Sequence, residues 1–83
     1  MSITVTLSTV NDVKDFVNAA SKMPVEIDAI EGAGTHKIDA KSIMGMFSLN
    51  LSEPVRIEYN SEDARLNEKT EKAFLDAVNR FRK

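Results

Sequence analysis

The 83-residue sequence contains no cysteine and no tryptophan, and it has a single histidine. Without cysteine, the chain cannot form a disulfide framework, a zinc knuckle, a redox-active dithiol or a cysteine nucleophile, so its stability must come from packing. A chain of this length has room for one hydrophobic core, because it buries only about 60% of the surface that it exposes when unfolded. We therefore expect a single domain over residues 1–83.

The sequence also lacks an excess of basic charge and any long apolar segment. Eleven lysines and arginines stand against 13 aspartates and glutamates, a net charge of −2, whereas a duplex nucleic-acid binder needs a clustered basic face. The apolar stretch over residues 43–47 is far shorter than the ~18–20 residues that cross a bilayer, and residues 1–10 do not resemble a secretory signal. We expect a cytoplasmic protein with neither nucleic-acid nor membrane partners.

Four strands are predicted by the hydrophobic periodicity. Apolar and polar residues alternate with a period of two over residues 3–7, 25–30 and 55–59, and more weakly over residues 36–39. The glycines within residues 32–35 permit a hairpin turn, so the second and third strands are expected to be antiparallel neighbours. The third or the fourth strand is expected to be an open edge.

Three helices are predicted between and after these strands. The first is amphipathic, begins at Ser8 or Thr9 and ends before Pro24, which disfavours helical dihedral angles in the residue before it. Ser42 can cap a short second helix over residues 42–49. The third has one apolar stripe, formed by Thr70, Ala73, Phe74, Ala77, Val78 and Phe81. Its basic residues, Arg80 included, are interspersed with acidic ones, which is typical of a solvated helix face.

The order strand, helix, strand, strand, helix, strand, helix predicts the α+β class. Helices of this size can cover one face of a four-stranded sheet and leave the other open, which makes an open-faced sandwich.

Two segments of the sequence resemble the HPr phosphocarrier family. The residues Lys41-Ser42-Ile43-Met44-Gly45-Met46-Phe47-Ser48-Leu49 are similar to the regulatory-serine segment of this family, particularly of its Gram-positive members, and Ala20-Ser21-Lys22 fits the end of its first helix. The predicted order of elements extends the resemblance over essentially the whole chain. It implies the HPr-like four-stranded antiparallel sheet with three helices on one face.

The phosphocarrier motif of the family is not present. In the family, a Gly-x-His-x-Arg-Pro segment follows the first strand, the histidine takes phosphate from enzyme I and the arginine steadies it. An ungapped alignment from residues 20–22 places Thr9 at the position of the histidine, Asn11 at that of the arginine and Asp12 at that of the proline. The glycine is missing too, the loop is shorter, and the only histidine, His36, lies beyond the predicted hairpin turn. We therefore expect no catalytic residue and no histidine phosphotransfer.

The chemistry of these residues leads to the same expectation. A threonine hydroxyl forms a stable phosphoester that is poorly suited to fast onward transfer, and Asp12 and Asp15 would repel an incoming phosphate. These two aspartates, three apart on a helix, are interpreted as a solvated first turn and not as a catalytic carboxylate pair.

No cofactor or metal site is expected. His36 is interpreted as an ordinary hairpin residue, because only Asp28 and Asp39 can approach it and no second histidine or cysteine is present. The sequence has no phosphate-binding loop and no nucleophile elbow.

Ser42 matches the family together with its neighbours. The resemblance implies phosphorylation of this serine by an ATP-dependent kinase, and a phosphoserine form that binds a transcriptional regulator of carbon catabolism. Ile43, Met44 and Phe47 match the apolar patch with which the family docks its protein partners, although Phe47 is bulkier than the usual aliphatic residue. Two simpler interpretations stay open: Ser42 is only a helix cap, and the three apolar residues belong to the core, which their spacing alone favours.

The leading hypothesis is a non-enzymatic HPr-like regulatory protein that docks partners through the surface around Ser42, under the control of serine phosphorylation. The alternative is a constitutive interaction or structural module on the same fold without phosphorylation. A phosphocarrier with a displaced acceptor is the third and least favoured hypothesis.

Overall fold

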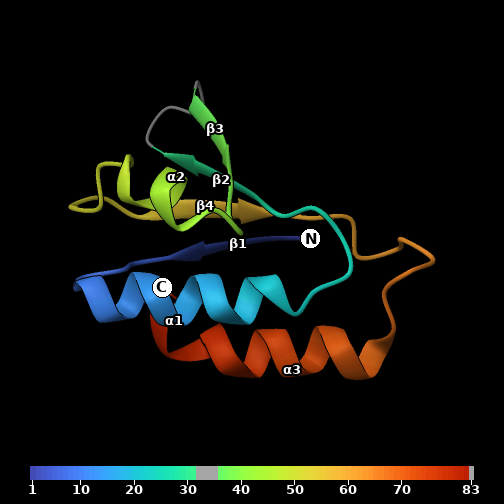
Figure 1. Ribbon diagram of the computed structural model, residues 1–83. Coiled ribbons are helices and arrows are strands. Elements are labelled where there is room, and N and C mark those ends of the chain that lie inside the picture. Colours follow the sequence, from blue (N-terminus) through green and yellow to red (C-terminus); the bar gives the residue numbers. More distant parts are fainter. Residues whose placement is uncertain (32–35, 83) are drawn as a thin grey trace.

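The computed structural model describes residues 1–31 and 36–82, so the predicted turn at 32–35 lies outside the described residues. The elements follow the predicted order (Figure 1): β1 (Ser2–Val5), α1 (Val10–Ser21), β2 (Asp28–Glu31), β3 (His36–Asp39), α2 (Ile43–Phe47), β4 (Val55–Glu58), α3 (Glu68–Val78) and a 3-10 turn, η1 (Asn79–Phe81). The expected α+β open-faced sandwich is therefore confirmed.

The four strands form one antiparallel sheet in the order β1-β4-β2-β3. Strand β4 lies in the middle, where Ile57 is opposite both Ile3 of β1 and Ala29 of β2. The expectation that the fourth strand could be an edge is wrong, because the chain returns after α2 to the gap between β1 and β2. Strand β3 is an edge, as expected, and it pairs with β2 as predicted.

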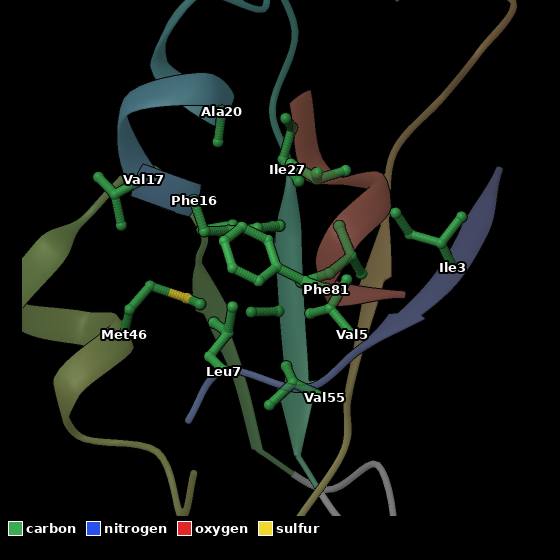
Figure 2. Close-up of a cluster of buried hydrophobic side chains, with 14 of the residues drawn as sticks. Ile3, Val5, Leu7, Phe16, Val17, Ala20, Ile27, Met46, Val55 and Phe81 are labelled. Atoms are coloured by element: carbon green, nitrogen blue, oxygen red, sulfur yellow. The ribbon is translucent and has the colours of Figure 1, made fainter. Parts of the chain in front are cut away.

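The hydrophobic core lies between the sheet and the helices. Figure 2 shows Phe16 of α1, Met46 of α2 and Phe81 of η1 in one cluster with Val5 and Val55 of the sheet, and all five side chains are buried. The alternation within β1 and β4 places every second residue in this cluster. The alternation in the sequence therefore predicted correctly which residues of β1 and β4 face the core.

Helix α3 departs from the expected stripe in two ways. It ends at Val78, and the chain tightens into η1 before the predicted end at Phe81. Phe74, Val78 and Phe81 are buried, but Ala73 and Ala77 remain exposed. The sheet covers only part of the apolar stripe, because one helix face also has to meet α1. Figure 1 shows α1 and α3 running side by side in opposite directions.

Tyr59 links the end of β4 to α3. Its hydroxyl donates a hydrogen bond of 2.7 Å to a carboxylate oxygen of Glu71. Burial, together with this bond to an anion, raises the pKa of the Tyr59 phenol well above its usual range. The phenol therefore stays protonated and remains a donor. Within the described residues, no helix is long and apolar enough to cross a membrane.

Candidate functional site

Ser42 caps the short helix α2. Its Oγ accepts a hydrogen bond of 3.1 Å from the backbone N–H of Gly45, and its carbonyl accepts one of 2.9 Å from Met46. The backbone N–H of Ser42 in turn donates to the carbonyl of Asp39 at the end of β3. These bonds fix the start of α2 against the sheet edge and leave the serine half-buried. The predicted cap is confirmed, although α2 ends at Phe47 and not at residue 49.

Three apolar residues of α2 are exposed and one is buried in the core. Met44 is 78% exposed, Phe47 is 40% exposed and Ile43 is 37% exposed, whereas Met46 is fully buried. Because α2 has only five residues, its one buried residue is enough to attach it to the core, and the other three side chains are turned outward. The interpretation of Ile43, Met44 and Phe47 as core residues is wrong. They form an exposed apolar surface, which we call the α2 patch.

Gly45 allows the cap and the patch to lie close together. A Cβ atom at this position would lie 3.2 Å from Oγ and 3.3 Å from Cβ of Ser42, closer than ordinary van der Waals contact. The glycine lowers the intrinsic helix preference by ~1 kcal/mol relative to alanine. Because glycine has no Cβ atom, the hydroxyl of Ser42 has room to cap the helix.

The start of α1 holds Thr9, the residue aligned with the histidine of the family. Its Oγ1 accepts a hydrogen bond of 3.1 Å from the backbone N–H of Asp12. The carboxylate of Asp12 accepts bonds of 3.0 and 3.3 Å from the backbone N–H groups of Ser8 and Thr9. This reciprocal capping box occupies backbone donors that a bound anion at this helix start would need. Asn11, aligned with the arginine, is exposed in the first turn.

Arg80 supplies a cation at this helix start that the sequence interpretation missed. Its guanidinium lies 2.6 Å from the carboxylate of Asp15 and 3.9 Å from that of Asp12. The two aspartates are therefore not merely a solvated first turn, because they share one arginine. Arg80 and Asp15 are 65 positions apart, so no local spacing relates them.

His36 begins the edge strand β3, is exposed and lies opposite Glu31 of β2. Asp28 and Asp39 are opposite each other three positions further along the ladder. Among residues 1–31 and 36–82, no group of three or more histidines, aspartates or glutamates is arranged to hold a metal ion. Among the described residues, no hydrogen bond or ion pair joins His36 to Thr9 or to the α2 patch.

Comparisons with known proteins identify one family. A family model described as "PTS HPr component phosphorylation site" matches residues 11–81. The crystal structure of HPr-C-His from Thermoanaerobacter tengcongensis is similar to this chain, with 27% sequence identity and a TM-score of 0.65, over 95% of this chain and 91% of that one. No curated protein sequence matches. The family match begins two positions after Thr9 and includes the whole α2 patch.

Proposed function

The chain belongs to the HPr family of phosphotransferase-system phosphocarrier-like proteins, and from this we propose that it is a single-domain regulatory docking protein in which histidine phosphotransfer is lost. The observation that carries the proposal is the α2 patch: three apolar side chains are turned outward beside the serine that caps the helix. A short helix that exposes three of its large apolar residues is expected to have a partner, since such surface is otherwise unfavourable in water.

The proposed loss of phosphotransfer is supported by the bonding at the start of α1. A carrier needs an exposed nucleophile and free backbone donors for the phosphoryl group. Here the hydroxyl of Thr9 bonds within its own helix, and the carboxylate of Asp12 bonds to the nearby N–H groups. The same carboxylate would repel phosphate.

Incubation with enzyme I and phosphoenolpyruvate is expected to leave the intact mass of this protein unchanged, while a histidine-bearing HPr in the same tube gains one phosphoryl group. Intact-mass spectrometry at neutral pH gives the readout. A heat- and acid-labile phosphoryl adduct would contradict the proposed loss of histidine phosphotransfer. If that adduct disappeared in a His36→Ala variant, the acceptor would be the displaced histidine.

Regulation at Ser42 is the finer part of the proposal. We propose that a serine kinase modifies Ser42, that the modified surface binds a transcriptional regulator of carbon catabolism, and that both encounters occur in the cytoplasm. A phosphate has a charge of about −1.5 to −2 at neutral pH, so it would place a strong anion at the border of an apolar surface. It would therefore change which partner the α2 patch accepts more than it would change the fold.

The kinase of the family and ATP are expected to add one phosphate that phosphosite mapping assigns to Ser42. A Ser42→Ala variant should take up none, while Ser48→Ala, which changes an exposed serine at the other end of α2, should behave as the parent does. Phosphate at Ser48, or none at all, would contradict this part of the proposal.

A constitutive docking module without phosphorylation is the second candidate function. It is favoured by one observation: Oγ of Ser42 is already used in the cap, where it accepts the bond from Gly45. Absence of phosphate after the kinase incubation, with partner binding through the α2 patch retained, would support this candidate.

A further inference from the structure

A groove with a volume of about 560 Å³ lies between α1 and α3. Its lining comes from these two helices and from Lys22 and Met23 just after α1, and it includes no residue of the α2 patch. Its volume falls within the ~300–1,000 Å³ that is typical of small-molecule sites. The docking function proposed above does not use this groove, so an inference about it stands independently.

The groove exists because short side chains meet between the two helices. Ala19 of α1 faces it together with Ala73 and Ala77 of α3, and the nearly buried Phe74 and Met23 also line it. Ala73 and Ala77 are the two members of the predicted apolar stripe that the fold leaves exposed. The groove therefore has an apolar interior that no element among the described residues covers.

The two ends of the groove differ in charge. Lys22 at the end of α1 and Lys69 in the first turn of α3 lie at one end, and within the described residues neither forms an ion pair. At the other end, Asp15 is held by Arg80 at 2.6 Å, so its charge is compensated. The groove thus has two lysines at one end and an ion-paired aspartate at the other. Lysine side chains can lay their methylene stems along apolar surface and keep the ammonium group in water.

We propose that this groove binds a small amphiphilic anion, with its apolar body along Ala19, Ala73 and Ala77 and its anionic head between Lys22 and Lys69. The seven positions from Asp15 to Lys22 correspond to about 10 Å along α1, a suitable length for a medium acyl chain.

Octanoate is the probe for this proposal, titrated below its micelle concentration into the ¹⁵N-labelled full chain. We expect saturable NMR shift changes at groove residues such as Ala19, Lys22 and Ala73, and none at Met44. Hexanoate is expected to bind roughly tenfold more weakly, because two fewer methylene groups are buried. Octylamine, which has the same chain and the opposite charge, is expected not to bind.

Variants test the apolar lining and the lysine end of the groove separately. Ala73→Leu, with Ala77→Leu as a second variant, should fill the groove and abolish the octanoate shifts, and urea unfolding checks that each is folded. Lys22→Glu combined with Lys69→Glu should weaken binding at least tenfold. The matched control, Lys14→Glu with Lys72→Glu, makes the same charge change on the same two helices outside the groove and should change binding less than twofold.

Four results would overturn the proposal: equal binding of octylamine, octanoate shifts centred on the α2 patch, equal losses in the two lysine double variants, or no saturable binding. Groove shifts that depend on protein concentration without octanoate would show instead that a second copy of the chain occupies the groove.

Discussion

Phe16→Ala is expected to lower the free energy of unfolding by about 3–5 kcal/mol. Phe16 is fully buried at the centre of the core, and its ring meets that of Phe74 edge to face, with centroids 6.2 Å apart. Phe74 makes a second such contact, of 5.8 Å, with Tyr59. Truncation therefore removes a large apolar side chain, leaves a cavity and ends an aromatic chain that joins α1, α3 and the end of β4.

Urea unfolding followed by circular dichroism measures this loss, with Phe47→Ala as the matched control. The control deletes the same atoms from a residue that is 40% exposed, so we expect it to lower the free energy of unfolding by only about 1 kcal/mol. The total free energy of unfolding of a small domain is only about 5–15 kcal/mol, so Phe16→Ala could unfold the protein. Phe16→Leu is therefore included as a milder variant whose smaller loss of stability stays measurable. Equal losses at positions 16 and 47 would mean that the core does not centre on Phe16.

Met46→Ala is expected to lower the free energy of unfolding by about 2–5 kcal/mol, and Met44→Ala by no more than about 0.5 kcal/mol. The two methionines are two positions apart on the same short helix, yet Met46 is fully buried and Met44 is 78% exposed. Met46 is the only buried residue of α2, so its truncation removes the contact that holds the helix to the core.

Thermal or urea unfolding of the two variants provides the measurement, and each variant is the control of the other, because both lose the same atoms and gain the same helix preference. If Met44→Ala proved as destabilising as Met46→Ala, α2 would be rotated from the orientation described, and the α2 patch would not be a surface. The expected asymmetry therefore tests the geometry on which the docking proposal depends.

The site could be predicted from the sequence only in its local parts. The caps of α1 and α2 could be predicted, because the hydroxyls of Thr9 and Ser42 accept hydrogen bonds from N–H groups only three residues away. The exposure of Ile43, Met44 and Phe47 was implied only by the resemblance to the HPr family, since their spacing alone favoured the core. A helix of five residues has too little sequence to indicate which side faces the sheet, and the packing of α2 against α1 and β3 decides it.

The sequence by itself determined the order of elements, the inward face of β1 and β4, and the absence of a histidine at the aligned acceptor position, because periodicity and residue identity are properties of neighbouring residues. Only the tertiary structure decided that β4 lies in the middle of the sheet, that Arg80 reaches Asp15 across 65 positions, and that Ala73 and Ala77 line an open groove. Each of these depends on the packing of distant segments against one core, and a pattern of near neighbours contains no information about which distant segment will be adjacent.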